Sequence, residues 1–455
     1  MMAESINPAS GEILATYRDY SANEIGVRAS QSSQAYASLR RTDFTARSKW
    51  MYEVADLLEK EKEKWAGLMT QEMGKLRTEA LAEVEKCAWV CRFYADNAAE
   101  FLKDRMITSD AYKSYVSYQP LGSILAIMPW NFPFWQVFRF AAPTLMAGNT
   151  AVLKHASNVP QCALAIEEIF HHSGFPTGSF QTLLVPGKAV EKLIAMPEIK
   201  AVTLTGSGPA GRSVAAAAGK HLKKSLLELG GSDPYIILED ADVHRAVDIA
   251  VKGRLLNCGQ SCIGAKRFIV VGDNYESFLH LFTSKMEGYK MGDPSDINTE
   301  LAPMASQELR DELHLQIEDA VSAGANLVLG GKIPDRAGAY YPPTIMTDVK
   351  KGMRAYTEEL FGPAAVVYRA RDEKEAIKIA NDSPFGLGAC VISTDVQRAE
   401  SIAREQLEAG SCFVNAPVAS DPRLPFGGIK ESGYGRELAE DGIKAFMNIK
   451  TVSIV

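Results

Sequence analysis

The sequence has no long apolar run and no broad basic stripe. No stretch approaches the length of a membrane span, and Met1 to Gly11 has neither the basic nor the apolar segment of a signal peptide. We therefore expect a cytoplasmic protein without a membrane partner. The net charge is −7, and binding a phosphate backbone needs a concentration of cations that is missing here. We expect no nucleic-acid partner, whereas a small anionic substrate needs only one or two local cations.

Metal-binding and disulfide patterns are also absent from the sequence. The seven cysteines are scattered, none forms a Cys-x-x-Cys pair, and the seven histidines show no His-Glu-x-x-His spacing. An odd number of scattered cysteines is typical of free thiols in a reducing compartment. We expect no metal site and no disulfide framework.

The length of 455 residues is too great for a single hydrophobic core, so two or three domains are expected. Apolar residues recur at three- and four-residue steps from Trp50 to Met69 and again from Ala80 to Tyr94, which predicts amphipathic helices. Cys87 and Cys91 share the apolar face of the second of these helices. They are therefore interpreted as core residues and not as a redox pair.

From residue 121 onward, short β-rich runs alternate with helical segments. This alternation is typical of βαβ units and of an α/β fold with a doubly wound, mostly parallel sheet. The first predicted strands are 124–128, 150–154, 180–185, 201–205, 225–229 and 235–238. A second alternation begins after residue 231 and adds strands at 267–271, 326–329, 364–368, 388–392 and 411–415. Ligands of such folds bind beyond the carboxyl ends of the strands.

These alternations divide the chain into two α/β domains, one formed by residues 1–110 and 121–230 and the other by residues 231–432. Two strand-like pieces, 112–118 and 451–455, belong to neither domain. An exposed strand is a hazard unless it is paired. We therefore predict that residues 111–120 and 433–455 form a small β element that joins copies of the chain into a homodimer or homotetramer.

The segment Asn257–Cys262 places a thiol in a loop of small polar residues, Asn-Cys-Gly-Gln-Ser-Cys. A thiolate is a nucleophile for carbonyl carbon, and this setting favours that function for Cys262 over a buried core cysteine. Cys258 either lines the loop or forms a regulatory disulfide with Cys262.

Glu228 stands between two leucines in Leu-Glu-Leu-Gly-Gly, at the end of a predicted strand. Apolar surroundings raise the pKa of a carboxyl and suit it to act as a general base. A second interpretation comes from residues 206–211, which read G-x-G-x-x-G, because an acid about 20 residues further on would then bind a ribose. This glycine run follows a late strand and not the first one, which favours the base.

Together these segments resemble the catalytic cysteine and glutamate of the aldehyde dehydrogenase superfamily, and similar segments extend from Asn7 to Gly435. Pro-Trp-Asn-Phe-Pro at 129–133 resembles the oxyanion segment, which implies that Asn131 and the backbone N–H of Cys262 stabilise the oxyanion. The resemblance implies a Rossmann-like cofactor domain, followed by a catalytic domain that carries Cys262. The presence of Cys262, Glu228 and Asn131 weighs against a catalytically idle relative kept as a structural protein.

The same resemblance assigns residues that bind a nicotinamide dinucleotide. They are Trp130, Lys154, Ser157, Gly206, Ser207, Gly211, Glu359 and Phe361. Ser207, at the start of a helix, would bind the pyrophosphate, Glu359 the nicotinamide ribose, and Phe361 would pack near the ring. The family commonly has an acid where Ser157 stands, and without that acid Lys154 can attract a 2′-phosphate. We therefore expect NADP⁺ to be preferred, with NAD⁺ as a second cofactor.

The implied reaction oxidises an aldehyde to a carboxylic acid through a cysteine thiohemiacetal and a thioester. Residues 130–139 resemble the branch of the family that acts on succinic semialdehyde, which is the expected substrate. On a helix beginning near Phe132, Trp135 and Arg139 share one face, and Arg139 can clamp a distal carboxylate. Ser261 and Ser420 can add hydrogen bonds. Alternatively, Arg139 pairs with a structural acid, and the aromatic side chains of this segment accept a broad range of apolar aldehydes.

Overall fold

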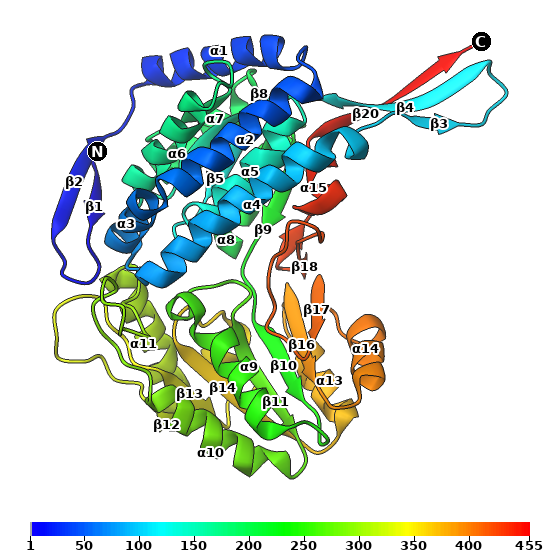
Figure 1. The fold of residues 1–455 in the computed structure, drawn as a ribbon. Coiled ribbons are helices and arrows are strands. Elements are labelled where there is room, and N and C mark those ends of the chain that lie inside the picture. Colours follow the sequence, from blue (N-terminus) through cyan, green and yellow to red (C-terminus); the bar gives the residue numbers. More distant parts are fainter. Residues whose placement is uncertain (1) are drawn as a thin grey trace.

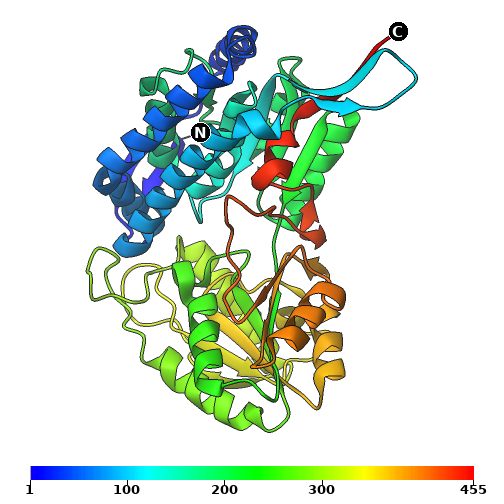
Figure 2. The same ribbon diagram turned by 45° about the vertical axis from the view of Figure 1, so that its right-hand side comes forward.

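Two mostly parallel sheets organise the structure, a computed structural model that describes residues 2–455. Each sheet is the centre of one lobe, and the two lobes lie one above the other in Figure 1. The last part of the chain, in red, returns from the lower lobe to the upper one, as Figure 2 also shows. No helix within residues 2–455 is long and apolar enough to cross a membrane.

The upper sheet has the strand order β19-β9-β8-β5-β6-β7, and only β19 runs antiparallel to its neighbour. Alternate residues of a strand point to opposite faces of a sheet. Ile124 and Ala126 accordingly pack with helices α2 to α6, whereas Leu125 and Ile127 pack with α7 and α8. Helices therefore cover both faces, as parallel sheets require. The strands are β5 (Ser123–Met128), β6 (Thr150–His155), β7 (Phe180–Thr182), β8 (Ile199–Thr205), β9 (Lys224–Glu228) and β19 (Gly433–Tyr434).

The lower sheet has the order β12-β13-β14-β11-β10-β16-β17, with β12 antiparallel to β13. Tyr235 and Ile237 pack with α9, α10 and α11, and Ile236 packs on the other face with α13 and α14. This sheet is also covered on both sides. Its strands are β10 (Asp233–Ile237), β11 (Ala265–Val271), β12 (Asn326–Leu329), β13 (Thr344–Thr347), β14 (Ala364–Ala370), β16 (Gly388–Ile392) and β17 (Ser411–Val414).

Several helices begin at a serine or aspartate whose side chain accepts a hydrogen bond from the third helical N–H, including Ser21, Asp43 and Asp242. The upper-lobe helices are α1 (Ala22–Leu39), α2 (Phe44–Lys60), α3 (Lys62–Met73), α4 (Arg77–Phe101), α5 (Trp135–Met146), α6 (Pro160–His172), α7 (Val190–Ala195), α8 (Gly208–Lys220) and α15 (Ala439–Lys444). Those of the lower lobe are α9 (Val243–Leu255), α10 (Asn274–Glu287), α11 (Gln307–Ser322), α12 (Arg354–Thr357), α13 (Glu373–Asn381) and α14 (Val396–Glu405).

The predicted elements overlap the observed ones with local differences. The apolar periodicity from Trp50 to Met69 predicts continuous helix, but the chain breaks at Glu61 between α2 and α3. Cys87 and Cys91 are fully buried in the core on α4, which confirms their interpretation as core residues. Each predicted strand overlaps an observed strand, whereas β13 and the N-terminal hairpin of β1 (Met2–Ile6) and β2 (Ile13–Arg18) were not predicted.

A separate three-stranded sheet projects from the upper lobe beside the C-terminus (Figure 1). It contains β3 (Arg105–Ile107), β4 (Lys113–Pro120) and β20 (Met447–Ile454), and β20 pairs with β4 along its whole length. The two strand-like pieces of the sequence therefore pair with each other. The predicted bounds of this element, 111–120 and 433–455, differ from the observed ones, because β3 starts earlier, β19 joins the upper sheet and α15 packs against α4 and α5.

Candidate active site

Cys262 lies in the loop between α9 and β11, after the short 3₁₀ helix Leu256–Gly259. Asn257 and Cys258 have φ values of 55° and 54°, a left-handed conformation that costs free energy in residues with a side chain. Asn257 is held there by the upper lobe. Its backbone N–H donates to Glu79 at 2.9 Å, and its Nδ2 donates to the carbonyl oxygen of Asn131 at 2.7 Å. The Cys262 loop is thereby fixed against the segment that carries Asn131.

Two buried cations hold the other side of this loop. Lys266 Nζ donates to the carbonyl oxygens of Ser261 and Cys262, both at 2.7 Å, and forms an ion pair with Glu359 at 2.9 Å. Arg254 donates to the carbonyl oxygens of Gly259 and Ala265. Neither cation was predicted as a site residue, because nothing in the sequence indicates that these side chains turn back onto the loop.

The Cys262 thiol is partly exposed, and its pKa is raised to about 12. Burial is the main cause, and the positive charges of Lys266 and Arg139 oppose it. The thiol is therefore protonated at neutral pH in the resting protein. Cys258 is more deeply buried, and burial raises its pKa as well. Both are free thiols.

Two cavities meet at Cys262, and both are lined by this residue and by Gln136. The first, which we call the Trp135 cavity, has a volume of about 230 Å³ and includes all four predicted substrate residues, Trp135, Arg139, Ser261 and Ser420. The second, the Trp130 cavity, has a volume of about 260 Å³ and includes Trp130, Asn131, Gly206, Ser207, Glu359 and Phe361. The structure thus gathers the predicted substrate residues on one side of the thiol and most predicted cofactor residues on the other.

Asn131 lies just before α5 and is 4% exposed. Its Nδ2 donates to the carbonyl oxygen of Gln260 at 3.0 Å, and its Oδ1 has no hydrogen-bond partner among the described residues. A primary amide has two N–H donors, so one remains for a ligand oxygen. The side chain can therefore donate to an oxygen that gains charge beside Cys262.

Glu228 ends β9 and is 2% exposed. Among residues 2–455 neither of its carboxylate oxygens has a hydrogen-bond partner, and the residue lines neither the Trp135 cavity nor the Trp130 cavity. Burial, and then the negative charge of Glu437, raise the pKa of Glu228 well above the usual value, while Arg139 and Arg436 act in the opposite direction. The carboxyl is held neutral here, outside the lining of the two cavities that meet at the thiol.

Arg139 is not a free cation in this structure. Its Nε forms a buried ion pair with Glu437, and its guanidinium lies 4.7 Å from the centre of the Phe426 ring. The remaining contact is a long hydrogen bond of 3.4 Å to Thr205 Oγ1. This arrangement matches the alternative in which Arg139 pairs with a structural acid, although the residue still lines the Trp135 cavity.

The predicted cofactor residues surround the first turn of α8 and the neighbouring strand ends. Ser207 is the N-terminal cap of α8, and its hydroxyl makes no capping hydrogen bond. Gly211 permits close packing, because a Cβ there would lie 2.6 Å from Leu229 Cδ1. The rings of Trp130 and Phe361 meet edge to face with centres 5.7 Å apart.

Lys154 and Ser157 lie at and beyond the carboxyl end of β6. Lys154 is 9% exposed, and burial lowers its pKa. Ser157 lines a further cavity of about 500 Å³, which shares Trp130 and Leu309 with the Trp130 cavity. The two cavities thus follow one another from Ser157 toward Cys262.

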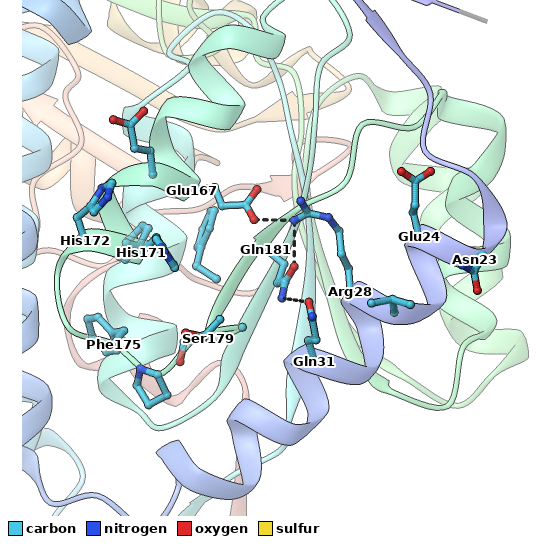
Figure 3. A pocket seen from close by; sticks show the side chains of 17 residues that line it. Asn23, Glu24, Arg28, Gln31, Glu167, His171, His172, Phe175, Ser179 and Gln181 are labelled. Atoms are coloured by element: carbon cyan, nitrogen blue, oxygen red, sulfur yellow. Dashed lines mark hydrogen bonds and ion pairs between the residues drawn. The ribbon is translucent and has the colours of Figure 1, made fainter.

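A cavity of about 620 Å³, larger than either cavity at Cys262, lies elsewhere, between α1, α6 and the edge strand β7 (Figure 3). Arg28 crosses it to Glu167 at 2.6 Å and to Gln181 at 3.0 Å, and Gln181 donates to Gln31. It shares no lining residue with the two cavities at Cys262. Cavity volume alone would therefore select this cavity over the two that are lined by Cys262.

Comparisons with known proteins identify the family of the chain. Residues 1–452 match the model of the aldehyde dehydrogenase family. A probable NADP⁺ succinate-semialdehyde dehydrogenase of a Synechocystis species is 51% identical over 454 residues, with full coverage of both chains. The NADP⁺ succinate-semialdehyde dehydrogenase 1 of Mycobacterium tuberculosis is 49% identical over 459 residues, again with full coverage.

Solved structures give the same result for the fold. The succinic semialdehyde dehydrogenase of Streptococcus pyogenes, in complex with NADP⁺, superposes with a TM-score of 0.97 at 40% identity and covers 99% of each chain. The structure of Gox0499 reaches 0.98 at 41% identity with full coverage of both chains. The predicted α/β fold and the predicted resemblance are confirmed, and the chain belongs to the aldehyde dehydrogenase family.

Proposed function

We propose that this protein oxidises succinic semialdehyde to succinate and prefers NADP⁺ to NAD⁺. The observation that carries the proposal is the meeting of the Trp135 and Trp130 cavities at one partly exposed thiol, Cys262. The Trp135 cavity is lined by aromatic and cationic side chains. The Trp130 cavity is lined by glycines and extends to the N-terminus of α8. The relatives that are named for this reaction and this cofactor, at about half identity over their full length, support the proposal.

Cys262 is the nucleophile that adds to the aldehyde carbonyl. Its backbone N–H and Asn131 Nδ2 donate to the oxygen that becomes negatively charged, and the carbonyl hydrogen bonds from Lys266 keep the loop in place for this. Since the resting thiol is protonated, it must lose its proton before or during the addition. A bound nicotinamide dinucleotide supplies the two-electron acceptor.

Glu228 is the base that activates water to hydrolyse the thioester. In its buried position the carboxyl is neutral, and it must turn toward Cys262 to act. Exposure to water and separation from Glu437 lower its pKa, so the same movement that brings the group to the thioester also ionises it.

The residues around α8 fit a nicotinamide dinucleotide. The free Ser207 hydroxyl and the first N–H groups of α8 suit a pyrophosphate, Glu359 suits ribose hydroxyls, and the edge-to-face pair of Trp130 and Phe361 leaves apolar surface beside Cys262. Lys154 and Ser157 favour a 2′-phosphate, because no acidic residue occurs from Thr150 to Gln161.

The substrate is tested by comparing kcat/KM for succinic semialdehyde with hexanal and benzaldehyde, using NADP⁺ and NAD⁺ in parallel. We expect the highest value for succinic semialdehyde with NADP⁺ and no turnover in the matched Cys262→Ala variant. A preference for the apolar aldehydes would instead favour the broad-specificity alternative, which the apolar wall of Phe132, Trp135, Ile263, Val418 and Phe426 would serve.

We also propose that the β3-β4-β20 sheet joins copies of the chain into a homodimer or homotetramer. The sheet projects from the body, and its apolar side chains Met106, Ile107, Ile449 and Ile454 are exposed. Sedimentation tests this proposal, and a monomer at micromolar concentration would contradict it.

A further inference from the structure

Lys86 is a second cation on the wall of the Trp135 cavity, and the sequence motifs do not mark it. It lies on α4, one turn beyond Glu83. Its Nζ donates to Ser420 Oγ at 2.9 Å and lies 4.2 Å from the centre of the Trp135 ring. Three separate elements, α4, α5 and the loop that contains Ser420, therefore converge on one ammonium group.

No carboxylate of residues 2–455 lies within ion-pairing distance of Lys86, whereas Arg139 on the same wall is paired with Glu437. The nearest acids are already occupied. Glu83 accepts the backbone N–H groups of Phe134 and Trp135, both at 2.9 Å, and pairs with Lys75. Lys86 is thus a half-buried positive charge whose neighbours leave it without an anion.

Two more acids border this region. Asp421 pairs with Arg423 at 2.7 Å, and Glu79 accepts the backbone N–H of Asn257 while burial raises its pKa. An ammonium has three N–H donors, and Ser420 takes one of them. Donors therefore remain for a ligand in the cavity, and the aromatic face of Trp135 keeps the charge in place without neutralising it.

We propose that Lys86, together with Ser420, binds the distal carboxylate of the substrate; this inference rests on the proposed function and names the residue that selects an acidic aldehyde. Arg139 stays paired with Glu437 and contributes positive electrostatic potential to the Trp135 cavity. A cavity of about 230 Å³ accepts a short aldehyde acid with its carbonyl at Cys262 and its carboxylate at Lys86.

The protonation of Lys86 agrees with this function. Its pKa is lowered to about 8, first by burial and then by Arg139, while Cys87, Glu83 and Asp421 oppose the shift. A bound carboxylate favours the charged ammonium and raises this pKa. The KM for an acidic aldehyde should therefore rise as the pH passes about 8, whereas the KM for an uncharged aldehyde should not.

The test compares succinic semialdehyde with butanal, which has the same number of carbons and no carboxylate. Lys86→Met keeps the length and the contact with Trp135 but removes the charge. Because the variant loses a hydrogen bond between two charged groups, kcat/KM for succinic semialdehyde should fall about 10- to 100-fold, mainly through KM. Butanal should be oxidised as well as before, and Lys86→Arg should restore most of the preference.

Lys62→Met is the matched control, because Lys62 is an exposed lysine that pairs with Glu85 outside both cavities. A Lys86→Met enzyme that retains the wild-type preference, or loses both aldehydes equally, overturns the inference and leaves the proposed function intact. A wild-type enzyme that does not prefer succinic semialdehyde to butanal overturns both. If the Met variant does not fold, Lys86→Gln gives the same readout.

Discussion

Replacing Glu437 by glutamine should destabilise the protein strongly, because it leaves the Arg139 guanidinium buried without a counter-charge. The two side chains are 2% and 6% exposed. The other contacts of Arg139 are a 3.4 Å hydrogen bond to Thr205 and the face of Phe426, and neither is an anion. Removing one partner of a buried pair typically costs about 3–5 kcal/mol. Because burial raises the pKa of Glu437 and so weakens its charged form, we expect the lower end of that range.

Urea unfolding, followed by tryptophan fluorescence and circular dichroism, measures this loss where the two signals coincide. The matched control is Glu100→Gln, which breaks an exposed pair with Lys103 and should cost less than about 1 kcal/mol. The double variant Arg139→Met with Glu437→Leu should recover much of the stability, since apolar residues often replace a buried pair without loss. A Glu437→Gln protein no less stable than the Glu100→Gln control would refute the reasoning.

The same Glu437→Gln variant tests the position from which Glu228 acts. Glu437 is the largest charge that raises the pKa of the buried Glu228 carboxyl. Because Glu228 acts after it has turned away from Glu437, the acidic limb of the kcat profile should stay at its wild-type pH. A limb that moves toward lower pH would mean that Glu228 acts from its buried position beside Glu437.

Three further variants test the site residues. Glu228→Gln should release about one equivalent of reduced nicotinamide per Cys262 and then stop, because the thioester is not hydrolysed; continued turnover would contradict this. It should also stabilise the fold at neutral pH but not below the ordinary glutamate pKa of 4.5, since a raised folded-state pKa costs stability as the pH rises above that value. Asn131→Ala should lower kcat by about 10²–10³-fold with little change in thermal stability. Ser157→Glu should raise the KM for NADP⁺ at least about 10-fold, because a carboxylate repels a 2′-phosphate; an unchanged KM would remove Ser157 from the cofactor site.

Much of the fold was predictable because its strands are short apolar runs separated by helices. Such runs mark buried parallel strands, and each of them overlaps an observed strand. β13 was not predicted because its segment, Thr344–Thr347, directly follows two prolines and contains only two large apolar residues. The helix break at Glu61 was not predicted because the apolar periodicity continues across it, and only tertiary packing turns α3 away from α2.

The candidate site was predictable where a local segment carries the chemistry. Cys262, Asn131 and Ser207 each lie in a short motif, and the structure brings them to adjoining walls. Lys266 and Lys86 have no such motif. The sequence did hold a signal for Lys86. Glu79, Glu83 and Lys86 recur at steps of four and three residues beside the apolar stripe of α4, and charged residues are rarely buried unless they are paired.

Arg139 and Lys86, the two cations of the Trp135 cavity, show why the rest of the site could not be predicted from the sequence. Arg139 follows Asn131 at helical spacing, and a sequence can therefore place it near the thiol. Whether its charge is free depends on Glu437, which lies far along the chain and reaches Arg139 only because β19 and α15 return to the upper lobe. Lys86 is free for the same kind of reason, since its neighbour Glu83 is used by Lys75 and by the start of α5. Residue type fixes which charges are present, but the tertiary pairing of acids decides which cation remains for the substrate.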